Sequence, residues 1–172
     1  LETLNRDIED MQSMLEAYLS FAKGEAEEDL GRLDLPGLIQ RLAGEAEMKG
    51  KHLTASLGDI GEISVRPNAF SRLITNLVTN AWRHAEHIAV EARISSRWLT
   101  IHVDDDGPGI PAHLREDVFK PFFRLDEARN LDASGTGLGL AIARDIARGH
   151  GGNVTLSESP MGGLRATVRI PV

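Results

Sequence analysis

The chain has 172 residues and a net charge of −7 at pH 7, from 19 basic and 26 acidic side chains. This balance disfavours a nucleic-acid partner, although a local basic patch around an anionic ligand remains compatible with it. The absence of cysteine excludes disulfides and thiolate chemistry and fits a reducing compartment. A hydrophobic content of 41% is enough for one well-packed domain with an appendage, and no apolar run approaches the ~18 residues of a membrane span.

Residues 1–24 have apolar side chains at alternating spacings of three and four, with charged residues between them. This seam predicts a helix that ends at Gly24 and packs against another helix; the alternative is an amphipathic helix packed on its own domain. The apolar positions are Leu1, Leu4, Ile8, Met11, Leu15, Tyr18 and Ala22. Because the chain begins inside this pattern rather than at a methionine, we expect it to be a segment of a longer protein.

The residues after this helix predict a linker and then a domain. Residues 25–33 are acidic and poor in apolar side chains, so we interpret them as the linker, and residues 34–172 as the domain. Asp34 is predicted to cap a helix that ends near Gly50, and short strands are expected at residues 52–57 and 62–66. Pro67 then begins a helix with a continuous apolar face.

Alternating apolar residues over 88–94 and 99–103 predict an antiparallel hairpin. We expect one short helix over 111–118, a lid-like loop over 119–134, a helix over 137–148 and a last hairpin from 154–158 and 164–172. Helices and strands therefore mix without a regular βαβ alternation. This pattern predicts an α/β fold, a two-layer sandwich with helices on one face of a mixed sheet.

Two stretches in the middle of the domain have side chains suited to nucleotide binding. Asn76 and Asn80 are four residues apart on a predicted helix and therefore lie on one face of it. Asp105 comes at the end of a predicted strand and is followed by Gly107 and Gly109. A buried carboxylate can accept a hydrogen bond from the exocyclic amine of adenine, and a glycine lets the base approach the backbone.

A third stretch, residues 134–140, has glycines at positions 135, 137 and 139 and leads directly into an apolar-periodic helix. Backbone N–H groups and the positive end of the helix dipole would meet a phosphate there. The spacing fits neither a Walker A loop nor the Rossmann fingerprint.

Together, the stretches 76–84, 105–110, 119–124 and 135–142 resemble the N box, first glycine box, F box and second glycine box of the ATP-binding domain of sensor histidine kinases, above all the class of the osmosensor EnvZ. The resemblance covers nearly the whole chain. It implies the Bergerat-type ATP-binding fold shared by gyrase, heat-shock chaperones, histidine kinases and MutL. It also implies that residues 1–24 are the second helix of a dimerisation and histidine-phosphotransfer hairpin.

The resemblance further implies a role for each box. Asp105 would read adenine, Asn80 would bind Mg²⁺, and Phe119 would anchor the lid. The candidate catalytic residues are Asn80, Arg83, His84 and Arg124. The candidate ATP-binding residues are Asn76, Asn80, Arg83, His84, Asp105, Gly107, Gly109, Ile110, Phe119, Arg124, Gly135, Thr136, Gly137, Leu138 and Gly139.

Asn76 decides between reaction classes, because hydrolysing relatives such as gyrase have at this point a Glu that activates water. An amide cannot accept a proton, so we expect the γ-phosphate to pass to another nucleophile. The acceptor histidine of the family precedes an acidic residue, and no histidine in this chain does so. We therefore expect the acceptor on a helix outside the chain.

The resemblance also implies the partners and location of the full protein. We expect a homodimer that relays the phosphoryl group to a response regulator, with this segment in the cytoplasm and the parent protein anchored in the bacterial inner membrane. ATP and ADP would be its small-molecule ligands. Two alternatives remain open: an ATP-hydrolysing conformational switch, and a non-catalytic dimerisation or binding scaffold.

Overall fold

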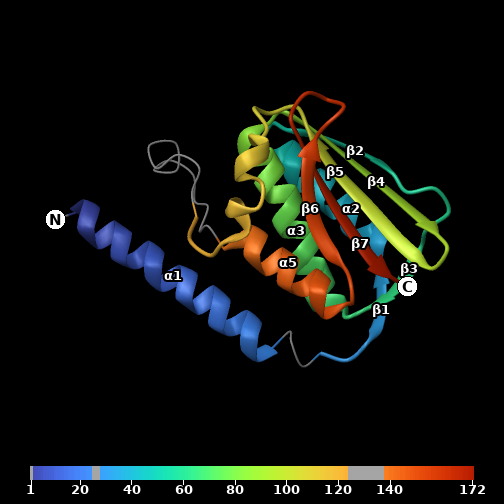
Figure 1. Ribbon diagram of the computed structural model, residues 1–172, viewed down its shortest axis with the longest axis horizontal. Helices are drawn as coiled ribbons and strands as arrows, with labels where there is room; N and C mark the ends of the chain where they lie inside the picture. The colour runs from blue at the N-terminus through green and yellow to red at the C-terminus, as the bar shows by residue number, and fades with distance from the viewer. Residues whose placement is uncertain (1, 25–27, 124–137) are drawn as a thin grey trace.

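The computed structural model describes residues 2–24, 28–123 and 138–172 (Figure 1). The elements in chain order are α1 (Glu2–Gly24), β1 (Gly31–Asp34), α2 (Leu35–Met48), β2 (His52–Ser56), β3 (Glu62–Val65), α3 (Pro67–His84), β4 (His87–Ser95), β5 (Trp98–Asp105), the short 3₁₀ helices η1 (Ala112–Leu114) and η2 (Asp117–Phe119), α5 (Gly139–Gly149), β6 (Asn153–Glu158) and β7 (Leu164–Pro171). No helix in these ranges has the length and apolar character needed to cross a bilayer.

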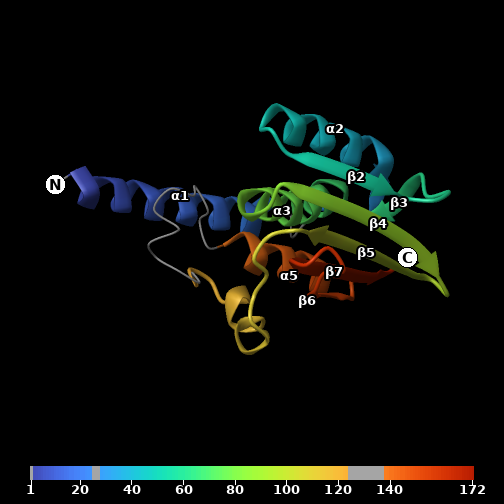
Figure 2. The same ribbon diagram turned by 90° about the horizontal axis from the view of Figure 1, so that it is seen from above.

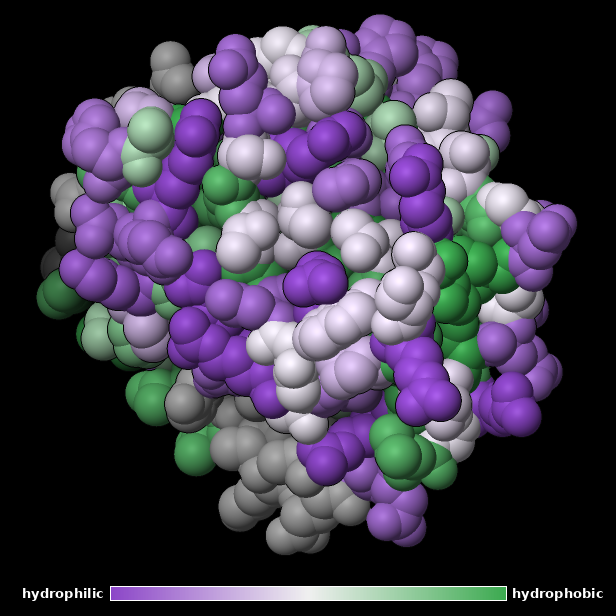
Figure 3. All heavy atoms as spheres, turned by 45° about the vertical axis from the view of Figure 1, so that its right-hand side comes forward, coloured by the Kyte–Doolittle hydropathy of each residue, from purple (hydrophilic) through white to green (hydrophobic). Residues whose placement is uncertain are grey.

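Five strands form one mixed sheet in the order β2-β4-β5-β7-β6. The β2–β4 pair is parallel and the other three pairs are antiparallel. Helices α2, α3 and α5 lie on one face of this sheet (Figure 2). The other face is mostly hydrophilic, as the side of the molecule turned to the viewer in Figure 3 shows. This arrangement confirms the predicted two-layer α/β sandwich.

The core lies between the sheet and the three helices. Every second side chain of β4, β5 and β7 points toward the helices, because successive side chains of a strand alternate between the two faces. Helices α2, α3 and α5 supply the facing apolar stripes, and burying each large side chain contributes roughly 1.5–3 kcal/mol. The largest fully buried side chains are Phe70, Leu35, Ile39, Leu42, Leu73, Ile74, Leu77, Ile88, Leu99, Ile101, Leu138 and Ile170.

Helix α3 begins with caps that come from distant parts of the chain. Pro67 occupies its first turn, and Arg66 provides no side-chain cap. The Glu28 carboxylate accepts the N–H groups of Asn68 and Ala69 at 2.9 and 3.0 Å. His150, at the end of α5, accepts the N–H of Arg66 through Nε2 at 3.0 Å. These contacts satisfy the first N–H groups of α3, which have no partner inside the helix.

Some predicted elements differ in the structure. Residues 31–33, which the sequence places in the linker, belong to β1, which pairs with β3 in a separate two-stranded sheet. The single helix predicted over 111–118 is replaced by η1 and η2. Part of the predicted lid over 119–134 lies outside the described residues. The cap at Asp34 is confirmed, since its Oδ1 accepts the N–H of Gly37 at 3.2 Å.

Candidate nucleotide-binding site

Asp105, at the end of β5, is a buried carboxylate with its two oxygens in different situations. Asp105 is only 5% exposed to solvent. Oδ1 accepts the N–H groups of Gly107 and Leu164, both at 3.0 Å, whereas Oδ2 accepts from no residue in the described ranges. Burial raises the pKa of Asp105, while the two N–H donors oppose this by stabilising the ionised form. Such a carboxylate can orient one oxygen toward a ligand amine.

The backbone packs so closely around Asp105 that glycine is required on both sides of it. A Cβ at Gly163 would lie 2.5 Å from the carbonyl oxygen of Asp105 and closer still to its Oδ1. A Cβ at Gly107 would lie 2.6 Å from the carbonyl oxygen of His84. The sequence motifs indicated Gly107 but not Gly163 or Leu164. The only local signal was the glycine pair in the turn of the last hairpin.

The aspartates on either side of Asp105 are used by the protein itself. Asp104 forms a two-point pair with Arg165 across β5 and β7, with distances of 2.8 and 3.0 Å. Asp106 accepts two backbone N–H groups at the start of β4 and contacts the ring of His87 at 2.7 Å. These bonds to His87 lower the pKa of Asp106 to about 2. The geometry is therefore compatible with Asp105 as the ligand-reading carboxylate.

Helix α3 lies beside both glycine motifs, with Asn76 next to Gly139 and the carbonyl oxygen of His84 next to Gly107. Asn76 donates from its side-chain amide to the carbonyl oxygen of Gly139 at 3.3 Å. Asn80, one turn further, is half-buried, and its side chain bonds no residue of the described ranges. Arg83 and His84 are exposed at the end of α3. The structure thus places the four α3 candidates along one path between the start of α5 and the end of β5.

The start of α5 supplies the described part of the predicted phosphate cradle. Leu138 is buried and its carbonyl oxygen accepts the first helical N–H, from Ile142, at 2.9 Å. A Cβ at Gly139 would have no atom of the described residues within 4 Å. Four candidates, Arg124, Gly135, Thr136 and Gly137, lie outside the described residues.

The segment that follows the first glycine motif is held by Arg144 of α5. Its buried guanidinium lies 3.4 Å from the ring centroid of Phe119 and donates to Glu116 at 2.6 Å and to the Val154 carbonyl at 2.9 Å. Ile110 is half-buried, and Arg115 donates to its carbonyl at 3.0 Å. Phe119 is therefore fixed to the core, and its role as an anchor of the lid stays a prediction. The sequence did not indicate a role for Arg144, because its helical spacing alone does not distinguish it from a surface residue.

No cluster of three or more His, Asp or Glu side chains that could hold a metal ion occurs in the described parts of the chain. Mg²⁺ prefers oxygen ligands and keeps several of its waters, so one side-chain carbonyl together with phosphate oxygens is enough to bind it. The amide oxygen of Asn80 is a suitable protein ligand for such an ion.

A family model described as "Histidine kinase-, DNA gyrase B-, and HSP90-like ATPase" matches residues 65–172. The sensor histidine kinase CpxA of Escherichia coli is 40% identical over 137 residues, which are 78% of this chain and 30% of that protein. The sensor histidine kinase GtrS of Pseudomonas aeruginosa is 34% identical over 177 residues, 99% of this chain and 35% of GtrS. The chain thus spans about a third of the length of these curated relatives.

Among solved structures, the ATP-binding domain of PrrB from Mycobacterium tuberculosis aligns with a TM-score of 0.65 at 31% identity, over 84% of this chain and 98% of that one. These similarities favour the kinase interpretation over the hydrolytic switch and the scaffold. The chain belongs to the family of histidine kinase-, DNA gyrase B- and HSP90-like ATPases, and its relatives there are the ATP-binding domains of sensor histidine kinases.

Proposed function

We propose that this chain is the catalytic part of a protein histidine kinase, which binds Mg-ATP and transfers the γ-phosphate to a histidine on a separate phospho-acceptor helix. Residues 1–24 would be the second helix of that acceptor hairpin, residues 25–30 would lead into the domain, and residues 31–172, beginning with β1, would form the ATP-binding domain. The observation that carries this proposal is the buried Asp105, which has one oxygen fixed by two N–H groups and the other directed to no described residue.

Within this proposal, the chain binds and orients ATP but has no base to activate water. Asp105 would accept the adenine amine, and Arg83, His84 and Arg124 would lie against the phosphates with the glycine run 135–139. Asn76 supports transfer rather than hydrolysis, because its amide already donates to Gly139 and cannot take a proton. Positioning and charge stabilisation supply most of the catalysis in phosphoryl transfer.

We assign the Mg²⁺ contact to the side-chain oxygen of Asn80. Bound Mg²⁺ would neutralise charge on the phosphate oxygens during transfer. Asn80→Ala should remove most of the enhancement that Mg²⁺ gives to ATP binding, while adenine recognition without metal stays largely intact. Calorimetric titrations with and without Mg²⁺ measure both quantities. A metal dependence equal to that of the parent chain would exclude Asn80 from the metal site.

Helix α1 supports the proposed pairing with an acceptor helix and with a second copy of the protein. It extends away from the sandwich in both views (Figures 1 and 2). Its apolar positions Leu4, Ile8, Met11, Leu15 and Leu19 are each 47–60% exposed. Such a stripe is typical of a coiled-coil seam. In the full protein we propose a homodimer that passes the phosphoryl group to a response regulator, with this part in the cytoplasm, where ATP is available, and the whole anchored in the inner membrane.

Transfer of the γ-phosphate from radioactively labelled ATP tests the proposal. The chain alone should bind Mg-ATP but give neither appreciable hydrolysis nor acid-labile phosphohistidine. Adding the phospho-acceptor hairpin of the longer parent protein should label the histidine of that hairpin. Steady ATP turnover by the chain alone would favour the hydrolytic switch instead. Phosphohistidine on the chain itself, for example at His84, would overturn the assignment of roles.

A further inference from the structure

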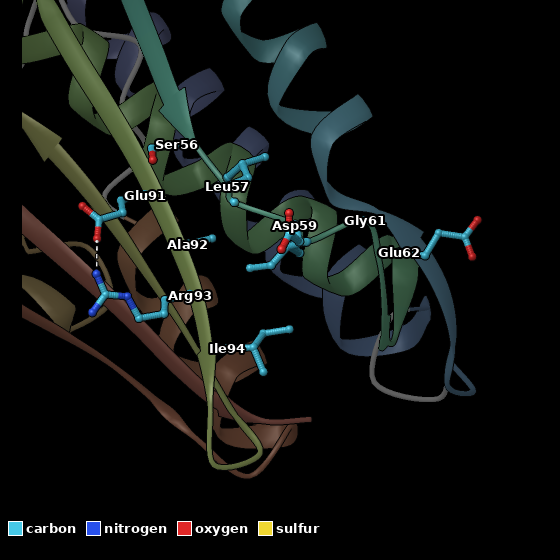
Figure 4. Close-up of a pocket in the computed structure, with 11 residues that line it drawn as sticks. Ser56, Leu57, Asp59, Gly61, Glu62, Glu91, Ala92, Arg93 and Ile94 are labelled. Atoms are coloured by element: carbon cyan, nitrogen blue, oxygen red, sulfur yellow. Dashed lines mark hydrogen bonds and ion pairs between the residues drawn. The ribbon is translucent and has the colours of Figure 1, made fainter.

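Strand β4 is longer than the strand beside it, which leaves part of its edge without a neighbour. Strand β2 pairs with His87–Glu91 of β4 and then ends at Ser56. The rest of β4, residues 92–95, pairs only with β5 among the described strands. A pocket of about 590 Å³ lies here, lined by residues 56–62 and 91–94 (Figure 4). It occupies the position that a continuation of β2 would take.

The hydrogen-bonding pattern of the hairpin directs Ile94 toward this pocket. Asp106 donates its N–H to the carbonyl of His87 at 3.2 Å, so His87 and every second residue after it bond toward β5. The intervening residues, including Ala92 and Ile94, direct their N–H and C=O groups to the opposite edge. No described residue pairs with Ile94 there. An unpaired edge of this kind can accept an added strand.

The side chains around the pocket divide into an apolar floor and an acidic rim. Ala92 and Ile94 point to the same side in Figure 4, away from Glu91 and Arg93. Along this face of β4 the exposed fraction rises from 1% at Val90 and 7% at Ala92 to 47% at Ile94. Leu57 and Ile60 are half-buried on the other wall.

The rim has an excess of negative charge. Arg93 is already paired with Glu91 at 3.4 Å on the opposite side of β4. Asp59 and Glu62 form no ion pair with any described residue. A second copy of the chain, added edge to edge, would bring its own Asp59 and Glu62 to the same rim and be repelled. A cationic segment would instead find unpaired carboxylates.

We propose that this pocket is a docking groove for an extended basic segment of a partner protein. The segment adds as a short strand beside β4, pairs with the backbone of Ile94, covers the Ile94 side chain and places lysine or arginine against Asp59 and Glu62. The groove is separate from the nucleotide site. Ile88 pairs with Asp105, and Ile94 is six residues further along β4, about 20 Å away at the rise of a strand.

A fluorescein-labelled hexapeptide of alternating lysine and valine is the probe, with fluorescence anisotropy on the full chain without nucleotide as the measurement. We expect saturable binding, with the amide signals of Ala92 and Ile94 shifted in a heteronuclear NMR titration. The double variant Asp59→Lys and Glu62→Lys should weaken binding at least roughly tenfold. Its matched control, Glu47→Lys with Glu158→Lys, makes the same charge change at exposed sites outside the pocket lining and should bind like the parent.

A second probe separates strand addition from simple charge attraction. The same peptide with alternate backbone nitrogens methylated keeps its charge but cannot pair with a strand edge, and we expect no saturable binding. Equal binding of the methylated peptide, equal weakening in the control variant, or no saturable binding of the first peptide would each overturn the proposal. Concentration-dependent dimerisation that the Asp59 and Glu62 variant abolishes would also overturn it, in favour of a second copy. None of these outcomes depends on ATP binding.

Discussion

The two ends of the β4–β5 hairpin are organised in opposite ways. At the end of β5, the carboxylates of Asp105 and Asp106 accept hydrogen bonds from backbone N–H groups. Oδ2 of Asp105 accepts none from the described residues. At the turn end, the backbone edge beside Ile94 pairs with no described residue, and the Ile94 side chain is 47% exposed. A site that recognises a ligand through one atom needs everything around that atom fixed. A site that recognises a backbone needs an edge left open.

The strongest test of the fixed end is Gly163→Ala. The new Cβ would overlap the backbone and carboxylate of Asp105, so we expect a loss of about 3 kcal/mol in the free energy of unfolding and a loss of ATP binding. Urea denaturation measures the first and calorimetry the second. Gly44→Ala is the matched control: its Cβ in α2 meets no atom within 4 Å, and we expect a gain of about 0.5 kcal/mol. Equal effects of the two changes would contradict the close packing around Asp105.

A gentler change at the same end is Asp105→Asn. Oδ1 would still accept the N–H groups of Gly107 and Leu164, which leaves the amide NH₂ facing the adenine amine, donor against donor. We expect ATP affinity to fall more than tenfold, or about 1.4 kcal/mol, with the fold retained. Calorimetry with circular dichroism as the folding check measures this. Unchanged affinity in a folded variant would place adenine elsewhere.

The lowered pKa of Asp106 predicts that the stability of the protein depends on pH. Its folded pKa of about 2 lies below its ordinary value of 3.8, so its contribution is complete above pH ~4 and is lost as pH falls toward 2. Because Asp106 is an exposed residue in contact with solvent, we expect a contribution of no more than about 1 kcal/mol. Asp106→Asn keeps an acceptor for the N–H groups of Glu86 and His87 but cannot titrate. Its unfolding free energy should change less than that of the parent between pH 4 and 2; parallel curves would refute this.

The smallest effect is expected at the turn end. Ser96 and Arg97 have φ values of 52° and 66°, a conformation that suits glycine better than either residue. Arg97→Gly should therefore raise the free energy of unfolding by about 0.5 kcal/mol. ATP affinity should stay unchanged, since the turn lies at the far end of the hairpin. Thermal unfolding with and without ATP measures both, and a change in ATP affinity would show that the two ends are coupled.

Patterns within a short stretch of sequence were enough to predict the strands and helices whose burial follows a regular period. The alternation along β4 and β5 predicted the hairpin that places Asp105 at a strand end, because burial of one face is visible in a short stretch. The apolar periods of α3 and α5 did the same for the helices. The order of the motifs then related these elements to a nucleotide pocket.

Features that depend on distant residues could not be predicted in this way. Gly163 is required because Asp105 packs against it, and the two are 58 positions apart. Strand β1 has only four residues and is defined by its pairing with β3. The helix expected over 111–118 is broken into η1 and η2, since Val118 and Phe119 turn into the core beneath Arg144. Intrinsic helix propensity is a weak determinant against such contacts.

The cap that Glu28 provides for α3 also determines how far α1 can travel. Glu28 is four residues beyond Gly24, the last residue of α1, so a fully extended chain lets that end of α1 lie at most ~14 Å from the Cα atom of Glu28, whose side chain caps α3. Without the cap, the next anchor is Gly31 of β1, and the reach grows to ~25 Å. A longer tether lowers the effective concentration of α1, and of the acceptor helix proposed to pair with it, at the surface of the ATP-binding domain. One carboxylate thus sets the local concentration at which the helix and the ATP-binding domain meet.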